Sequence, residues 1–214
     1  GFPLYEIART GQNRAAGPGL NRLGHRAVLA DHTMRAITAP NNDTIYSSAQ
    51  LELSGGPIEI VSPTDTQRYF NVTFMDAFTD NFAGMGTRLT KGQGGTYWLA
   101  GPEWRGAAPA GVTLLRSSTN DVWMLARIVV DGPDDLEAAK ALQRQITIRP
   151  TTDKPPRPFA VKATNVQDPE NFLGVVNEML SRSPGGLGHM ARAPRFAAAG
   201  IGAGATPGAD LVGM

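Results

Sequence analysis

Between residues 44 and 131 the chain alternates short apolar segments with turn-forming residues, and this alternation limits the fold more than any other feature. The segments are rich in β-branched and aromatic residues, whereas Gly, Pro, Asn, Asp and Ser occupy the positions between them. This pattern predicts strands at residues 45–53, 58–61, 68–75, 96–99, 112–115 and 122–130. Short strands at this spacing favour a mainly β fold, a jelly-roll-like antiparallel β-sandwich.

Helices are predicted on both sides of this β-rich region. The first ten residues place apolar side chains on one face of a short helix, and residues 11–24, rich in Gly, Asn and Arg, indicate a loop. Downstream, Gly132 and Pro133 precede two acidic residues, which is typical of a helix start. We expect this second helix to reach about residue 144.

The C-terminal part of the chain predicts an extended linker followed by a helical extension. Asp168 is the expected N-cap of a helix, with Pro169 in its first turn. Apolar residues then recur at helical spacing and form one stripe, made of Phe172, Val175, Val176, Met179 and Leu180. We expect this stripe to pack in the core or at an interface, and an exposed stripe indicates a homo-oligomer. We therefore divide the chain into a β-sandwich domain with an N-terminal helix at 1–150 and an extension at 151–214.

Composition excludes several classes of function. A net charge of +1 over 214 residues gives no long-range field, so nucleic acid and anionic membranes are not expected partners. No apolar run approaches the roughly 20 residues that a transmembrane helix needs. The absence of cysteine rules out disulfides and thiolate chemistry. Because the sequence begins Gly1-Phe2-Pro3, without methionine, we expect a segment upstream of it.

Three consecutive polar residues directly before the first predicted strand form the first candidate site. Asp43 is a candidate general base, and the amides of Asn41 and Asn42 would orient a substrate. Tyr46 lies on the polar face of the strand that follows, because strand side chains alternate with a period of two. The alternative is an Asx-turn, in which these side chains satisfy backbone groups at the strand entry.

A second polar cluster follows the predicted strand at 68–75. Asp76 and Asn81 flank a turn that also contains aromatic residues. A polar pair between aromatic rings suits a small ligand, with Asp76 as a second candidate base. The alternative is that the aromatic rings belong to the core and the polar groups cap the turn.

Arg127 lies inside the most hydrophobic predicted strand, so its guanidinium either meets an acid or lies at the edge of a pocket. In the first case Asp43 or Asp76 is the expected partner. In the second case Arg127 binds a carboxylate or phosphate group through two parallel hydrogen bonds. Arg88 is a second candidate for binding the same small anionic molecule, and Trp123, on the strand of Arg127, is assigned to substrate binding.

The sequence identifies no cofactor and no metal centre. His25 and His32 are seven residues apart, and neither they nor His189 have a third ligand at a telling spacing. A serine nucleophile motif and a phosphate-binding loop are both missing from the sequence.

Several motifs occur in the order found in a bacterial family known as domain of unknown function 1254, which the chain resembles over roughly residues 1–204. The motifs are Ala39–Ser48, Arg68-Tyr69, Asp76–Ala83, Gly86–Arg88, Gly101–Trp104, Pro109–Val112, Thr119-Asn120 and Val130–Leu136. The resemblance implies a jelly-roll protein, usually with a second jelly-roll domain downstream and often with a secretory or lipoprotein signal. It therefore implies a periplasmic or secreted location, and a chain that is either a truncated paralogue or half of a split pair. It brings no established reaction.

Two functional hypotheses follow. In the first, the protein is a small-molecule binder or an enzyme of hydrolytic or acid/base type, with a polar pocket on the sandwich. The catalytic candidates are Asp43, Tyr46 and Asp76, and the substrate-binding candidates are Asn41, Asn42, Asn81, Arg88, Trp123 and Arg127. In the second, it is a non-catalytic module that pairs with another copy or with a partner carrying a second jelly-roll domain.

Overall fold

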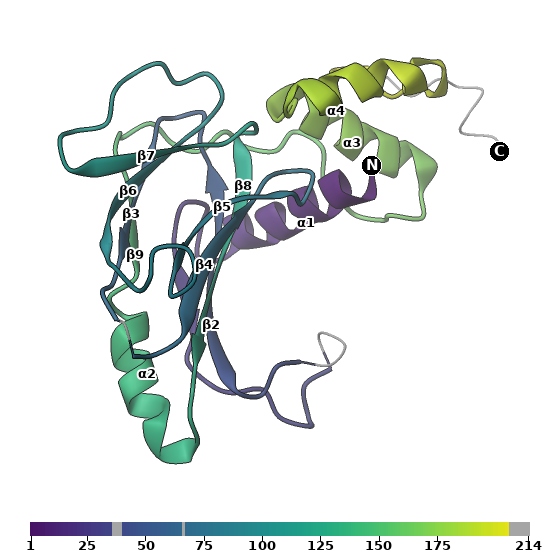
Figure 1. The fold of residues 1–214 in the computed structure, drawn as a ribbon. Helices are drawn as coiled ribbons and strands as arrows, with labels where there is room; N and C mark the ends of the chain where they lie inside the picture. Colours follow the sequence, from purple (N-terminus) through teal and green to yellow (C-terminus); the bar gives the residue numbers. More distant parts are fainter. Residues whose placement is uncertain (36–39, 66, 206–214) are drawn as a thin grey trace.

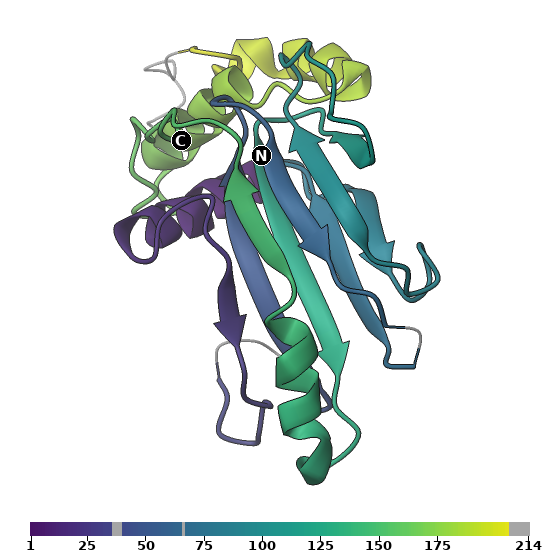
Figure 2. The same cartoon turned by 90° about the vertical axis from the view of Figure 1, so that its left-hand side faces the viewer.

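Two β-sheets pack face to face and a group of helices lies beside one of them in the computed structural model, which describes residues 1–35, 40–65 and 67–205 (Figures 1 and 2). Sheet A has five strands in the order β1-β2-β8-β4-β5, and sheet B has four in the order β7-β6-β3-β9. The strands are β1 Gly24–Arg26, β2 Thr44–Glu52, β3 Ile58–Ser62, β4 Phe70–Met75, β5 Asn81–Gly86, β6 Gly95–Ala100, β7 Val112–Arg116, β8 Asp121–Val129 and β9 Thr147–Pro150.

The mainly β sandwich with flanking helices is therefore confirmed, and each of the six predicted strands has a counterpart. One sheet is mixed, because β6 and β7 pair in parallel whereas the other pairs are antiparallel. The jelly-roll pattern of connections stays a prediction. Ala39, the first residue of the first family motif, and residues 206–214 of the expected extension lie outside the described residues.

Sequence reasoning missed β1, β5 and β9. β5 is rich in glycine, which weakens any strand pattern. The glycine at position 86 has φ +124°, and a Cβ there would lie 2.3 Å from the carbonyl oxygen of Phe70. Glycine is therefore required for β5 to pair closely with β4, so the residue that hides the strand from a pattern search also lets the strand form.

The core lies between the two sheets and takes alternate residues from the long strands of sheet A. Ile45 of β2, Phe70, Val72 and Phe74 of β4, and Met124 of β8 are fully buried in it. The period of two turns the intervening side chains away from sheet B. We call this second surface, made by Tyr46, Asn71, Thr73, Trp123, Leu125 and Arg127, the outer face of sheet A; its side chains are only partly buried.

Helices cover one end of this outer face and close one edge of the sandwich. They are α1 Phe2–Ala16, α2 Leu136–Gln143 after a short 3₁₀ turn at Pro133–Asp135, α3 Pro169–Arg182, α4 Leu187–Arg192 and a 3₁₀ segment at Ala193–Ala199. α1, α3 and α4 lie together beside sheet A in Figure 1. Among the described helices, none has both the length and the apolar character that crossing a bilayer requires.

The N-terminal helix is longer than the sequence predicts, so the loop expected at 11–24 is wrong for residues 11–16. Gly11 does not end the helix because it serves packing: a Cβ at this position would lie 2.8 Å from the ring of Phe159. The close approach of the 156–164 segment to α1 therefore depends on a glycine that lowers helix propensity.

The predicted apolar stripe of α3 packs against α1. Val175, Val176 and Met179 are almost fully buried, and Tyr5 of α1 stacks on Phe172 with ring centroids 5.7 Å apart. The expectation that this stripe is exposed is wrong, because α1 already covers it. A homo-oligomer stays a prediction, and its subunits would have to meet through a surface other than this buried stripe. The division of the chain at residue 150 also stays a prediction.

Candidate functional site

The predicted site residues fall into three separate places. β2 and β4 both pair antiparallel with β8, so they run in the same direction. Asn41, Asn42 and Asp43 precede β2, whereas Asp76 follows β4, and the two predicted carboxylates therefore lie at opposite ends of sheet A. The structure does not bring them to one pocket.

The first cluster stabilises the turn that leads into β2. Asn41 Oδ1 accepts a hydrogen bond from the backbone N–H of Asp43 at 3.0 Å, and Asp43 Oδ1 accepts one from Thr44 Oγ1 at 2.6 Å. Asn41, Asn42 and Asp43 are exposed. This is the Asx-turn arrangement, in which short polar side chains satisfy nearby backbone groups.

The second cluster holds the turn between β4 and β5. Asp76 Oδ1 accepts backbone N–H groups from Phe78 at 2.8 Å and from Asp80 at 3.0 Å, and Asp76 is buried. Asn81 begins β5 and is exposed. The turn-capping alternative accounts for these contacts.

The third group meets on the outer face of sheet A. Tyr46 of β2 and Arg127 of β8 are register partners, and the Arg127 guanidinium lies 5.8 Å from the centroid of the Tyr46 ring. Trp123 lies on the same face of β8, two alternations before Arg127. Arg88 follows β5 and stacks over Tyr69 at 5.5 Å. The expected pairing of Arg127 with Asp43 or Asp76 is wrong, since Arg127 contacts an aromatic ring instead.

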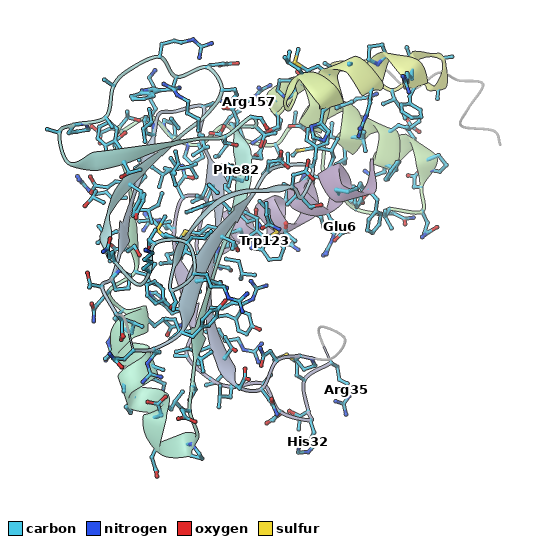
Figure 3. The ribbon with its side chains drawn as sticks, viewed as in Figure 1. Glu6, His32, Arg35, Phe82, Trp123 and Arg157 are labelled. Atoms are coloured by element: carbon cyan, nitrogen blue, oxygen red, sulfur yellow. The ribbon has the colours of Figure 1, made fainter. Side chains whose placement is uncertain are left out.

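A pocket of about 300 Å³ adjoins this face. Its sheet side is formed by Tyr46, Ser48, Trp123 and Leu125, which alternate outward from β2 and β8. Its other walls come from α1 and from the loop before β2, through Arg14, Val28, Met34 and Asn41. In Figure 3, Trp123 lies on the sheet beneath α1, and the loop that carries His32 and Arg35 projects below it.

Positive charge dominates this pocket. Arg14 and Arg26 line it, and none of its described lining residues is Asp or Glu. Arg14 Nη2 donates to the carbonyl of Ser48 at 2.9 Å, whereas its Nε is buried and has no hydrogen-bond partner within the described residues. Burial, and then the charge of Arg144, lower the pKa of His25, so this imidazole is neutral at neutral pH.

Sequence reasoning missed Arg14 and Arg26. The spacing of Leu4, Ile7, Ala8 and Gly11 continues the helical period past the tenth residue, and this signal would have placed Arg14 on a helix. Arg26 lies on a three-residue strand for which the sequence carries no pattern.

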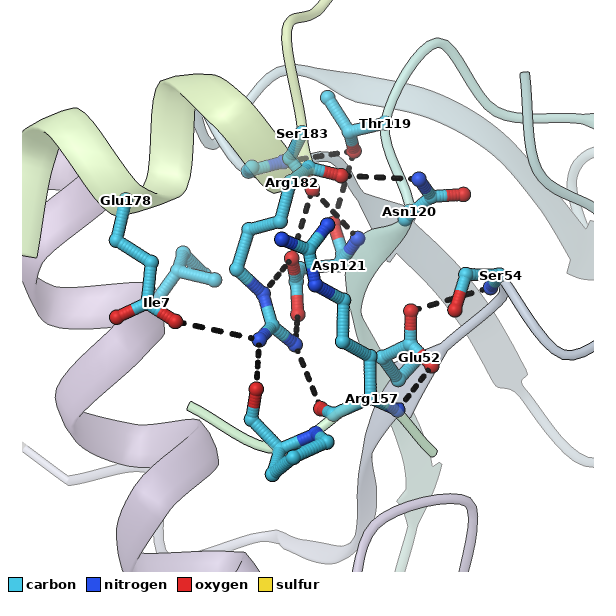
Figure 4. A network of polar contacts seen from close by, with 12 residues as sticks. Ile7, Glu52, Ser54, Thr119, Asn120, Asp121, Arg157, Glu178, Arg182 and Ser183 are labelled. Carbon is cyan, nitrogen blue, oxygen red and sulfur yellow. Dashed lines mark hydrogen bonds and ion pairs between the residues drawn. The ribbon is translucent and has the colours of Figure 1, made fainter. Parts of the chain in front are cut away.

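A further polar cluster is structural. Arg182 of α3 donates to both carboxylate oxygens of Asp121 on β8 and to the carbonyls of Arg157 and Pro158 (Figure 4). Ser183 Oγ donates to the same carboxylate at 2.7 Å. Because these contacts use Nε and both terminal nitrogens of the guanidinium, the cluster fixes α3 to the sandwich and offers no free donor group to a ligand.

The described residues also contain one set of potential metal ligands. Asp76 and Asp80 of the β4–β5 turn and His189 of α4 each place one ligand atom within 4.8 Å of the others. His189 lies far from these carboxylates along the chain, so no spacing in the sequence connects them.

The comparison with family models decides the family. The model described as "Protein of unknown function (DUF1254)" matches residues 20–150, well over half of the chain. The chain belongs to this family. The DUF1254 match begins just before β1 and ends with β9, so it covers the strands of both sheets, whereas α1 with Arg14 precedes it.

A solved structure shows the same fold. The VPA0106 protein from Vibrio parahaemolyticus superposes with a TM-score of 0.77 at 21% identity, over 99% of this chain and 52% of that one. This DUF1254 chain therefore spans about half the length of that relative. An uncharacterized protein from Burkholderia cenocepacia matches 59% of this chain and 34% of its own, with a TM-score of 0.39 at 14% identity. No curated protein matches the sequence.

Proposed function

We propose that this protein binds a small organic anion in the pocket on the outer face of sheet A. The proposal rests on Arg127. Its guanidinium has no ion-pair partner within the described residues, and it lies over the ring of Tyr46, a residue that lines the pocket. The ligand class is a compact carboxylate or phosphate with an apolar or aromatic body.

The Tyr46 ring holds Arg127 without using its hydrogen-bond donors. A cation–π contact stabilises a guanidinium by about 0.5–1 kcal/mol at an exposed site, and its N–H groups remain free. These N–H groups form a planar fork that matches the two oxygens of a carboxylate or phosphate. Arg127 is therefore suited to bind one anionic group at the edge of the pocket.

Arg14 also favours an anion, because it lines the pocket. Its Nε is a buried donor without a partner among the described residues, and such a donor normally carries a cost of about 1–3 kcal/mol. Because protein atoms cover this nitrogen, Arg14 would act on a ligand through its positive charge at the pocket wall. Trp123 and Leu125, which line the same pocket as Arg14, offer apolar contact to the body of the ligand. A volume of about 300 Å³ suits a ligand of metabolite size.

Binding is better supported than acid/base catalysis. Asp76 caps a turn and Asp43 accepts a hydrogen bond from the Thr44 hydroxyl at the opposite end of the sheet, and neither carboxylate lines the pocket. Tyr46 is the catalytic candidate that lines the pocket. We therefore assign Tyr46, Trp123 and Arg127 to ligand binding, and Asn41 to the loop wall.

A thermal-shift screen of small carboxylates and phosphates tests this function. Ligands that raise the melting temperature of the wild-type protein are retested on Arg127→Met and on Arg14→Met. The matched control is Arg105→Met, which removes an exposed arginine from the loop after β6. The proposal expects both site variants to lose the shift and the control to keep it. Equal shifts in all four proteins would overturn it.

A second candidate function is assembly through the C-terminal helices. Leu187, Met190 and Phe196 are 87%, 52% and 54% exposed, an unusual concentration of large apolar side chains on two consecutive short segments. We propose a second copy of this chain as the partner that covers them. Size-exclusion chromatography with light scattering should then show a dimer for the wild-type protein and a monomer for Leu187→Ser/Phe196→Ser. A wild-type monomer contradicts this candidate.

A further inference from the structure

A cluster of three metal-ligating side chains lies outside the proposed binding pocket, where the β4–β5 turn meets α4. Asp76 and Asp80 come from the turn, and His189 comes from the helix. One oxygen or nitrogen of each residue lies within 4.8 Å of the others, and His189 Nε2 is 3.5 Å from Asp80 Oδ2. Two segments that are distant in sequence therefore direct two carboxylates and an imidazole at one point.

The turn fixes the Asp76 carboxylate before any ligand binds. Its Oδ1 accepts the backbone N–H groups of Phe78 and Asp80, which leaves Oδ2 with a single contact, from Ser118 Oγ at 3.3 Å. A hydroxyl at this distance is a weak donor. Oδ2 is therefore an oriented oxygen with capacity to bind a cation.

The imidazole is fixed as well. The ring of His189 stacks on Phe78, with centroids 3.8 Å apart and planes inclined by 13°. Gly185, just before α4, has φ +80°, and a Cβ there would lie 2.4 Å from the Phe78 ring. Glycine at this position therefore allows the stack, and the stack holds the imidazole beside the carboxylates.

The charge of the cluster points to a cation. Asp76 is only 3% exposed and makes no ion pair within the described residues. The residues outside that description, 36–39, 66 and 206–214, contain no Lys, Arg or His. A buried carboxylate without a counter-charge is costly, and Asp80 brings a second negative charge close to it. A divalent cation would neutralise both.

We propose that Asp76, Asp80 and His189 bind a divalent transition-metal ion of the Zn²⁺ type. Imidazole and carboxylate are ligands that Zn²⁺ accepts, at about 2.0–2.2 Å, with a tetrahedral geometry that places ligand atoms about 3.3–3.6 Å apart. The Asp80 side chain is 69% exposed, so its rotation is free to close the observed spacing. Three protein ligands leave a fourth position for water, which is the arrangement of an open zinc site.

Metal binding would join α4 to the sandwich. The turn belongs to sheet A, whereas His189 belongs to the C-terminal helices, so one ion would bridge two parts of the structure. Because the folded chain binds the ion and an unfolded chain lacks the assembled site, binding must raise thermal stability. The site therefore has a readout that does not depend on any catalytic activity.

Isothermal titration of chelator-treated protein with Zn²⁺ tests the proposal, together with the melting temperature with and without Zn²⁺. We expect one ion per chain and a rise in melting temperature that EDTA reverses. His189→Ala and Asp80→Asn should each weaken binding by about tenfold or more. Both residues are more exposed than Asp76, so these variants avoid the turn cap that Asp76→Asn would break.

His32→Ala is the matched control, since it removes an exposed histidine far from the cluster. It should bind Zn²⁺ like the wild-type protein. Co²⁺ provides a second measurement, because a tetrahedral site gives it strong visible absorption that the His189→Ala variant should lack. Absence of saturable Zn²⁺ binding by the wild-type protein would overturn the proposal. Equal binding by the wild-type, His189→Ala and Asp80→Asn proteins would overturn it as well.

Discussion

Arg182 and Asp121 form a bidentate ion pair in the interior of the protein, with Nε–Oδ2 and Nη2–Oδ1 distances of 2.9 and 3.0 Å. Their side chains are 1% and 6% exposed. Arg182 also lies over the ring of Phe159 at 4.0 Å. This pair connects α3 with β8, so it determines how the helices that cover the outer face of sheet A are fixed to the sandwich.

Removal of one member of this pair should destabilise the protein strongly. Arg182→Met leaves the Asp121 carboxylate buried without its counter-charge, and we expect a loss of about 3–5 kcal/mol in the free energy of unfolding. Urea denaturation measures it. Arg149→Met is the matched control, because Arg149 is 72% exposed and its pair with Glu59 should contribute less than about 1 kcal/mol. Similar losses in the two variants would contradict a structural role for the buried pair.

The pair of Arg68 and Asp135 makes stability depend on pH in the acid range. Hydrogen bonds from the Arg68 guanidinium and from the Asp131 backbone hold the pKa of Asp135 at about 2, below its usual 3.8. Since the folded-state pKa is the lower one, the contribution is complete above about pH 4 and is lost as the pH falls through about 2.

Asp135→Asn should therefore lower the free energy of unfolding at neutral pH, and the difference from the wild-type protein should shrink between pH 4 and pH 2. Urea denaturation at a series of pH values measures this difference. The control is Asp134→Asn, an exposed neighbour. A wild-type advantage over Asp135→Asn that persists unchanged at pH 2 would be inconsistent with the ion pair.

Gly86 should tolerate substitution far less well than Gly111. Both have positive φ, +124° and +79°, but a Cβ at position 86 would lie 2.3 Å from the carbonyl oxygen of Phe70, whereas position 111 has no atom within 4 Å. We expect Gly111→Ala to cost about 1 kcal/mol and Gly86→Ala about 3 kcal/mol or more. Chemical denaturation compares the two variants. Equal costs would contradict the close pairing of β4 with β5.

The sequence predicts the long strands of this fold because their patterns are local. β2 and β8 are nine residues long each, and the predicted ranges 45–53 and 122–130 match them closely. α3 is equally well marked, since Asp168 accepts the backbone N–H of Glu170 as the expected N-cap. Patterns of this kind depend on periodicity and capping, which a sequence displays directly.

The site is harder to predict because it depends on strand direction and on tertiary contacts. The role of Arg127 at a pocket edge stays a prediction, and only the directions of the strands in sheet A show that Asp43 and Asp76 lie at opposite ends. Asp76 and His189 lie close together in space but far apart in the sequence, so no local sequence pattern predicts their contact. The glycines at 11 and 86 mislead in another way, since both serve close packing inside regular elements where a pattern search expects a break.

The most direct test of the anion site uses Trp123 as a reporter. The protein has three tryptophans, and Trp98 and Trp104 contact each other beside sheet B, so Trp98→Phe/Trp104→Phe leaves Trp123 alone on the pocket wall. A carboxylate or phosphate that stabilises the protein is titrated against this fluorescence, with and without Arg127→Met. We expect a saturable change that Arg127→Met abolishes. A ligand that stabilises the protein and leaves Trp123 emission unchanged, or changes it equally in both proteins, would contradict it.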